Sequence, residues 1–252
     1  MLDLTEDFLL VIFTVAASLL LILGLNRLWP SQTRRAHNEL IGWQLTVLGT
    51  TYAVIVGFML YTVWTNFELA DSNVSAEANS LVNVFQLAEG LPASQRADLQ
   101  KAAIAYADTV VNAEWPAMAR KEEHFAAERP KEEMWRILMT VKTASPTEST
   151  AEDHAITELS SMTEHRRMRE LGSSSHLPGI LWWVLIVGGF LTVVSACMFG
   201  AENMTLHTLQ VAFFSLLIAL ILVAIADIDQ PFRGTVHVRD AAFRQAQQTM
   251  EK

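Results

Sequence analysis

The chain of 252 residues is 51% hydrophobic, and its 27 Asp and Glu residues outnumber its 18 Lys and Arg residues. A surface that binds nucleic acid needs an excess of basic side chains, so the acidic balance argues against nucleic acid as a partner. The single cysteine, Cys197, cannot form a disulfide within the chain, and we interpret it as a small packing residue.

Four apolar blocks are the dominant feature of the sequence. They cover residues 8–25, 40–64, 180–200 and 209–226, and none of them contains Asp, Glu, Lys or Arg. At about 1.5 Å per helical residue, each block is long enough to cross about 30 Å of hydrocarbon. Lipid offers the backbone no hydrogen-bond partner, so segments of this length must be helical. The sequence therefore predicts an all-α membrane protein with four transmembrane helices, two on each side of a polar insert.

These blocks divide the chain into consecutive regions. Residues 1–64 are expected to form a first transmembrane hairpin, 65–177 a helical soluble insert, 178–229 a second transmembrane hairpin and 230–252 a short C-terminal tail. The stretch before the first block is acidic, and no small-residue cleavage site precedes Asn26. We therefore expect a permanent helix there and not a removed signal peptide.

The arginines indicate an orientation in the membrane. Three of them lie in the connection between the first two blocks, and six flank the opposite ends of the membrane helices. Because basic residues are retained on the cytoplasmic side, this bias favours a cytoplasmic location for both termini and for the insert. The six arginines are Arg166, Arg167, Arg169, Arg233, Arg239 and Arg244.

The insert is acidic, and its apolar residues recur at helical spacing. It contains eleven Lys and Arg residues against eighteen Asp and Glu residues. The apolar pattern continues the second transmembrane helix beyond the membrane as far as Gly90 and Pro92. Three further helices are expected within the insert: one that ends near Trp115–Pro116, one over Lys131–Lys142 and one over Glu148–Leu171.

The sequence contains none of the familiar catalytic or metal-binding motifs. There is no nucleophile elbow, no glycine-rich phosphate loop, no H-E-x-x-H and no C-x-x-C pair. The histidines of the insert are widely spaced, and we interpret them as surface residues and not as metal ligands. We therefore expect no enzyme activity, no metal and no cofactor. These histidines are His124, His154, His165 and His176.

The second transmembrane helix carries small residues along one face. Such a face allows two helices to pack closely, which is common in membranes, or it lines a narrow water-filled path. A path of this kind would have no charged ring, because the block contains no Lys, Arg, Asp or Glu. The small residues follow one another at steps of three or four and are Gly42, Thr46, Gly49, Ala53 and Gly57.

An acidic turn follows the fourth transmembrane helix. It reads Asp227-Ile228-Asp229-Gln230-Pro231-Phe232-Arg233-Gly234. The carboxylates of Asp227 and Asp229 either end the helix in solvent or contribute to a cation site, and Pro231 and Phe232 turn the chain.

Several of these motifs occur together in one family. The D-x-D-x-P-F-x-G turn, the run Gly49-Thr50-Thr51-Tyr52-Ala53-Val54 and the insert motif Glu114-Trp115-Pro116 resemble the bacterial bestrophin-like family of unknown function, DUF4239. Trp64, Ala70 and Glu77–Ala78 also fit, and the resemblance extends from Asn38 to Val238.

The resemblance implies a channel. True bestrophins are similar in having four spans, a helical cytosolic region after the second span and a pore lined by the second helix, and they are pentameric anion channels. By that analogy the chain forms a homo-oligomer, such as a pentamer, in the lipid bilayer of the bacterial inner membrane and passes small anions such as chloride. The residues that would line or shape its pore are Gly49, Tyr52, Ala53, Gly57 and Phe58.

The sequence departs from true bestrophins after the fourth span. True bestrophins have a proline-phenylalanine-glycine turn there, whereas in this sequence Arg233 separates Phe232 from Gly234. The acidic run that forms the calcium clasp of animal bestrophins is also missing, so calcium gating is not expected. The competing hypothesis is a non-conducting membrane scaffold or sensor, in which the small face packs helices and the acidic cytosolic helices bind a partner.

Overall fold

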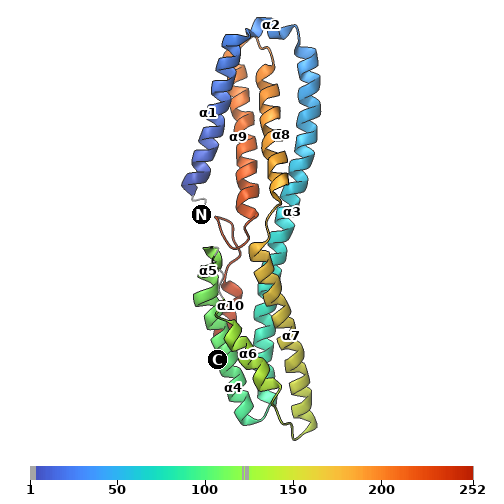
Figure 1. The fold of residues 1–252 in the computed structure, drawn as a ribbon, viewed down its shortest axis with the longest axis vertical. Coiled ribbons are helices and arrows are strands. Elements are labelled where there is room, and N and C mark those ends of the chain that lie inside the picture. The colour runs from blue at the N-terminus through green and yellow to red at the C-terminus, as the bar shows by residue number, and fades with distance from the viewer. Residues whose placement is uncertain (1–3, 121, 123–124, 252) are drawn as a thin grey trace. The chain divides into compact units, whose positions relative to one another are not determined.

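A computed structural model describes residues 4–120, 122 and 125–251. Within these residues every regular element is helical and no strand occurs, which confirms the all-α part of the prediction (Figure 1). The chain folds as two compact units. Unit 1 comprises the chain up to Thr65 together with His176–Asp229, and unit 2 comprises Asn66–Ser175 together with the chain from Gln230 onward.

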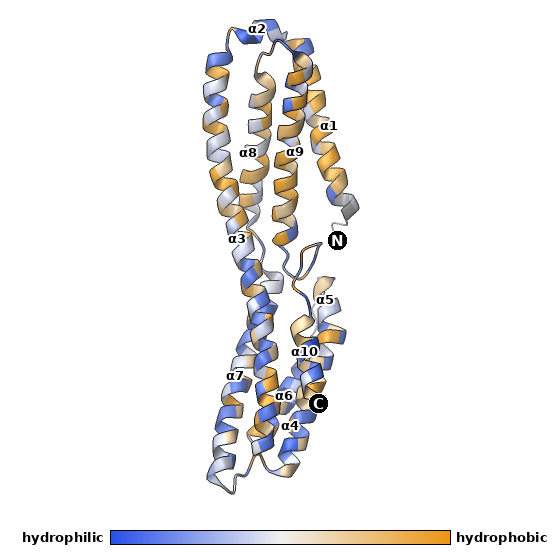
Figure 2. Cartoon of the chain, turned by 180° about the vertical axis from the view of Figure 1, so that it is seen from behind, coloured by the Kyte–Doolittle hydropathy of each residue, from blue (hydrophilic) through white to orange (hydrophobic). Residues whose placement is uncertain are grey.

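Unit 1 contains three of the helices that are long and apolar enough to cross a membrane and the first part, up to Thr65, of a fourth. The described residues contain four of them, as the sequence predicts: α1 (Leu4–Leu28), α3 (Asn38–Leu87), α8 (Gly179–Met198) and α9 (Met204–Ile228). Figure 2 shows hydrophobic residues along most of α1, α8 and α9. Ile22, Leu185 and Ile225 are fully buried in the shared core, whereas many other apolar side chains face outward, as a lipid environment requires.

A close backbone approach joins the ends of these helices. The short helix α2 (Ser31–Arg35) follows α1, and its backbone lies against Gly200 in the α8–α9 connection. A Cβ atom at Gly200 would lie 2.6 Å from the backbone nitrogen of Arg35 and 2.7 Å from the carbonyl oxygen of Ser31, so only glycine fits. The Asn38 side chain then donates to the Gly200 carbonyl and accepts from its N–H, each at 2.8 Å.

Arg34 is fully buried at this same junction. Its guanidinium donates to the Cys197 carbonyl at 2.5 Å and to the side-chain oxygen of Asn26. Burial lowers the pKa of Arg34, because desolvation disfavours its charged form. The carbonyl of Cys197 belongs to the last turn of α8, so the negative end of that helix dipole compensates the cation.

Unit 2 is a bundle of helices around its own apolar core. Its central side chains are fully buried and include Leu81, Leu99, Met134, Leu159 and Phe243. Besides the second part of α3, it contains η1 (Ala88–Gly90), α4 (Ala93–Thr109), η2 (Val110–Glu114), α5 (Trp115–Ala119), α6 (Glu128–Leu138), α7 (Pro146–Ser174) and α10 (Ala241–Met250).

The structure corrects the predicted helix ends. The prediction that a helix stops near Trp115–Pro116 is wrong, because a five-residue π-helix, η2, leads from α4 directly into α5. Pro116 cannot donate a backbone hydrogen bond back into η2, and the wider turn of the π-helix before it accommodates the proline ring. The helix expected over Lys131–Lys142 instead spans Glu128–Leu138. The helix expected over Glu148–Leu171 is longer than predicted and spans Pro146–Ser174.

Candidate functional site

The second membrane helix is the element on which the sequence analysis placed the pore. In the structure it is α3, a single helix of 50 residues. Within unit 1, Tyr52, Val56 and Val63 form its buried face and belong to the core shared with α8 and α9. Most of the remaining surface of α3 between Leu40 and Trp64 is exposed, so α3 is packed within the subunit along one face only.

Tyr52 lies on that buried face. Its ring packs directly on α8, where a Cβ atom at Gly188 would approach Tyr52 Cδ2 to 2.8 Å and one at Gly189 would approach the hydroxyl oxygen to 2.9 Å. The two glycines of α8 therefore make room for the aromatic ring. The Tyr52 hydroxyl has no hydrogen-bond partner among the described residues.

The other predicted pore residues lie elsewhere on the helix. Ala53, Gly57 and Phe58 are exposed, with 64% of Phe58 accessible, and Gly49 is half-buried. A Cβ atom built at Gly49 or Gly57 would meet no atom within 4 Å. The structure thus brings Gly49, Ala53 and Gly57 together on an uncovered strip of α3 and places Tyr52 on the packed face beside it.

Two threonine hydroxyls on the uncovered surface of α3 donate to the backbone of the same helix. Thr46 Oγ1 donates to the Gly42 carbonyl and Thr62 Oγ1 to the Phe58 carbonyl, each at 2.9 Å. Such bonds let a hydroxyl lie in an apolar environment while its oxygen can still accept a hydrogen bond. The exposed surface is therefore suited to lipid, to another helix or to a narrow pore.

The acidic turn after the fourth apolar helix connects two helix ends. The Asp229 carboxylate accepts a hydrogen bond from the Leu177 N–H at 2.9 Å, and its carbonyl oxygen accepts one from His176 Nδ1 at 3.2 Å. These contacts tie the end of α9 to the segment that leads into α8. Within the described residues, no group of three or more His, Cys, Asp or Glu side chains has the arrangement of a metal site.

The hydrophobic half of the turn belongs to unit 2. Phe232 is buried and packs against Trp115 in a T-shaped arrangement, with ring centroids 5.7 Å apart. Pro231 is also buried, and its carbonyl oxygen accepts a hydrogen bond from the Val238 N–H at 2.7 Å. Gly234 has a φ of 83°, a left-handed conformation that glycine adopts without strain. Pro231 and Phe232 thus form a tight turn anchored in the core of unit 2.

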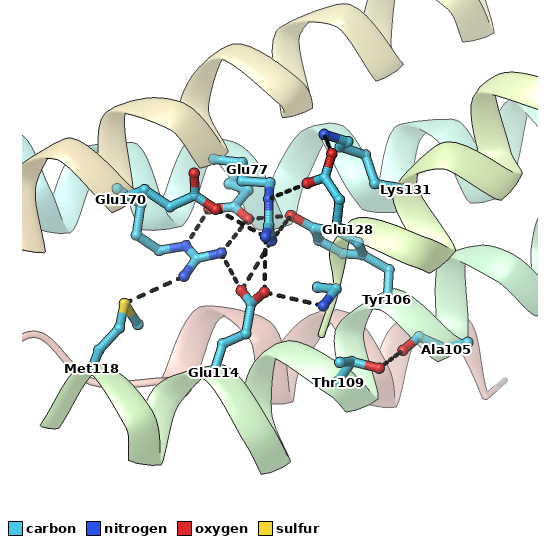
Figure 3. Close-up of polar contacts among 12 residues, drawn as sticks. Glu77, Ala105, Tyr106, Thr109, Glu114, Met118, Glu128, Lys131 and Glu170 are labelled. Atoms are coloured by element: carbon cyan, nitrogen blue, oxygen red, sulfur yellow. Dashed lines mark hydrogen bonds and ion pairs between the residues drawn. The ribbon is translucent and has the colours of Figure 1, made fainter. Parts of the chain in front are cut away.

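Unit 2 also contains a buried cluster of charged side chains that the sequence analysis did not identify. Glu77 and Glu114 are at most 2% exposed, and so are Arg166 and Arg169. Figure 3 shows the polar contacts around Glu77, Glu114 and Tyr106. Arg169 donates to Glu77 at 2.7 Å and to Glu114 at 3.0 Å, and Arg166 makes two bonds to Glu114 at 2.8 and 2.9 Å. The Tyr106 hydroxyl donates to Glu77 at 2.5 Å.

The charges of this cluster stabilise one another. Burial by itself would lower the pKa of Arg169, but the carboxylates of Glu77 and Glu114 raise that pKa well above its ordinary value. Burial likewise opposes ionisation of Glu114, yet the hydrogen bonds and charges of Arg166 and Arg169 lower its pKa below the usual range. The raised pKa of Arg169 and the lowered pKa of Glu114 both favour the ionised form, so the partners within the cluster offset the cost of burying these charges.

Comparison with known families decides the classification. A model described as the Bestrophin-like domain matches residues 12–243. The chain belongs to the bestrophin-like family. The bestrophin-like part of the sequence-based resemblance is therefore confirmed, and it covers both units.

Solved structures show the same fold for this bestrophin-like chain. A substituted bacterial bestrophin homologue from Klebsiella pneumoniae has a TM-score of 0.69 at 15% identity, and the alignment covers 98% of this chain and 100% of the other. Another structure of a Klebsiella pneumoniae homologue gives 0.67 at 14% identity, with 95% and 96% covered. A crystal structure described only as a membrane protein gives 0.69 at 14% identity, covering 98% of each chain. No curated protein matches the chain.

Within the bestrophin-like fold, the histidines of the insert occupy different environments. His154 is exposed, as expected, whereas His165 is half-buried and its Nδ1 lies 3.1 Å from the side-chain oxygen of Asn73. His176 Nδ1 donates a hydrogen bond to the carbonyl oxygen of Asp229. His124 lies outside the described residues.

A sequence signal for the buried charge cluster did exist. Glu77 and Arg169 lie at positions of their helices that otherwise carry buried apolar or small residues, such as Ala70 and Val74 on α3. A charged residue on an apolar helical face implies a buried partner. The partners themselves are separated by up to 92 positions, so spacing alone does not pair them.

Proposed function

We propose that this protein is a homo-oligomeric channel in which α3 helices from several subunits surround a path for small anions such as chloride. The observation that carries the proposal is the uncovered strip of Gly49, Ala53 and Gly57 on a helix that is packed within its subunit along one face only. Membership of the bestrophin-like family supports the same reading.

A ring of subunits would account for the uncovered strip. Cyclic assemblies place the same helix of every subunit around one axis, and small residues let those helices approach closely without closing the path. Five subunits, as in true bestrophins, would suffice. On this proposal the protein lies in the bacterial inner membrane with both termini and unit 2 in the cytoplasm.

The chemistry of the strip favours partial dehydration of the ion over capture by a charge. The membrane block of α3 from Leu40 to Trp64 contains no charged residue. An anion at the constriction would meet backbone dipoles, aromatic edges and hydroxyl groups, which can replace part of its hydration shell. Phe58 and Gly57 would set the width there, and Tyr52 would act from the packed side by positioning α3 against α8.

The proposal is tested by chloride flux from liposomes that contain the purified, size-characterised oligomer. Gly57→Trp should lower the flux at least tenfold, since about 1.4 kcal/mol added to a barrier lowers a rate tenfold. Gly24→Trp in α1 is the matched control, because Gly24 is also an exposed helical glycine whose Cβ would meet nothing within 4 Å.

The two variants must be compared in oligomers of the same size. Equal flux in wild type, Gly57→Trp and Gly24→Trp would show that this part of α3 does not line the path. No flux from an intact wild-type oligomer would favour the scaffold or sensor hypothesis.

A further inference from the structure

A groove lies between α1 and α9 in unit 1. Its volume is about 1000 Å³. The described residues that line it come from α1, α2, α9 and the connections beside them, and none of these described residues belongs to α3. The groove is therefore separate from the candidate pore strip.

The lining of the groove is apolar at one end and polar at the other. Leu19 and Leu23 of α1 and Leu209 of α9 lie within the apolar membrane blocks. Arg35 and Glu202 lie in the connections that join the membrane helices, where a membrane protein meets the lipid headgroups. The lining thus changes from apolar to polar as a phospholipid changes from acyl chain to headgroup.

The polar end presents one charge of each sign. Arg35 and Glu202 are the two charged residues among the described lining residues, and Arg35 Nη1 donates to Glu202 Oε1 at 3.2 Å. Their side chains are 37% and 88% exposed, so a headgroup can reach both of them. An ion pair this exposed contributes little stability, and exchanging its partners for those of a ligand therefore costs little.

These two charges favour a headgroup that itself carries both signs. A phosphate can pair with the Arg35 guanidinium, and a primary ammonium group can pair with the Glu202 carboxylate. Phosphatidylethanolamine supplies both groups. Phosphatidylglycerol supplies the phosphate but no cation, so Glu202 would face a second negative charge.

We propose that this groove binds phosphatidylethanolamine, with its phosphate on Arg35 and its ammonium group on Glu202. One acyl chain lies along Leu19, Leu23 and Leu209, where burial of its methylene groups adds to the affinity. The site concerns lipid binding and does not depend on conduction or on the number of subunits.

The test compares two lipids that differ only in the headgroup. Native mass spectrometry of the full-length protein in detergent micelles measures the binding of dioleoyl phosphatidylethanolamine and of dioleoyl phosphatidylglycerol. Phosphatidylethanolamine should bind about fivefold more tightly, the effect of one exposed charge pair. Glycerophosphoethanolamine, the same headgroup without acyl chains, should not displace the lipid at equal concentration, because it lacks the apolar contacts.

Variants of the two charged residues locate the site. Glu202→Gln should abolish the preference between the lipids, because it removes both the partner of the ammonium group and the repulsion on phosphatidylglycerol. Arg35→Gln should weaken binding of both lipids, because both present a phosphate. Arg27→Gln and Glu39→Gln are the matched controls and should bind both lipids as the wild type does, since Arg27 and Glu39 are exposed and do not line the groove.

Each of five results would overturn the site. Saturable binding of phosphatidylethanolamine to the wild type could be absent, or the two lipids could bind equally, as ordinary boundary lipid does. The preference could persist in Glu202→Gln, or Arg35→Gln could bind both lipids as the wild type does. Displacement of the lipid by glycerophosphoethanolamine at equal concentration would show a headgroup site that does not use the apolar end of the groove.

Discussion

At the residue scale, the strictest requirement in the molecule is the pairing of charges inside unit 2. Arg169 is 1% exposed, and its guanidinium is shared between Glu77 and Glu114. It also lies over the ring of Trp115 at 6.0 Å from the centroid. Removing one member of such a group leaves the others buried without a partner, which costs far more than the pairing itself contributes.

Arg169→Met should therefore destabilise the protein by about 3–5 kcal/mol. Arg167→Met is the matched control: Arg167 is exposed on the same helix, so its loss should change stability by no more than about 0.5 kcal/mol. The measurement is the free energy of unfolding of the full-length protein in detergent. Similar values for the two variants would show that the buried cluster is not structurally required.

The same cluster makes stability depend on pH. Because the folded-state pKa of Glu114 is lowered, its ionised form contributes stability that is fully present above the unfolded-state pKa of about 4.3. That contribution should be lost as the pH falls from this value towards the lowered folded-state pKa. Glu114→Gln should be less stable at neutral pH and should lose less stability than the wild type on acidification, which unfolding at a series of pH values would reveal. An identical acid dependence would contradict the assignment.

At the element scale, the contact between α3 and α8 depends on two glycines. A Cβ atom at Gly188 would lie 2.8 Å from the ring of Tyr52, so Gly188→Ala forces the ring or the helices to move and should cost about 1–3 kcal/mol. Gly24→Ala in α1 meets no neighbour and should gain up to about 1 kcal/mol from helix propensity. Unfolding measurements that place both variants on the same side of the wild type would contradict this packing.

The elements could be predicted from the sequence where one strong constraint acts. The membrane helices follow from apolar length, because lipid permits no other backbone conformation for such segments. The predicted helix end at Trp115–Pro116 is wrong because the π-helix before Pro116 lets the chain continue as a helix through the proline. Local composition does not indicate that the helix continues through η2 into α5, because this path depends on packing within unit 2.

Only part of the candidate site followed from the sequence. The spacing of Gly49, Ala53 and Gly57 at steps of four predicts one common face, and the structure shows these residues on one uncovered strip. Tyr52 was grouped with them from the family resemblance, yet the adjacent position on a helix points about 100° away, and its ring packs on α8. The Glu114–Arg166 pairing needed the tertiary fold, since 52 positions separate the two residues.

At the scale of the whole molecule, the outward surface of α3 is the feature on which the proposed assembly depends. Trp43, Phe58 and Tyr61 are each more than 60% exposed there, next to glycines without neighbours. Assembly around α3 would bury the small residues against or near other copies and leave the remaining apolar surface to lipid. The bestrophin-like classification and this surface together lead to the proposed anion channel.

The most direct test of that central claim is the reversal potential of currents through the purified oligomer in a planar bilayer with a tenfold KCl gradient. An anion channel should reverse near the chloride equilibrium potential, about 59 mV in magnitude for a tenfold gradient of a monovalent ion. A reversal near the potassium equilibrium potential, which has the opposite sign, would contradict anion conduction and assign the path to cations.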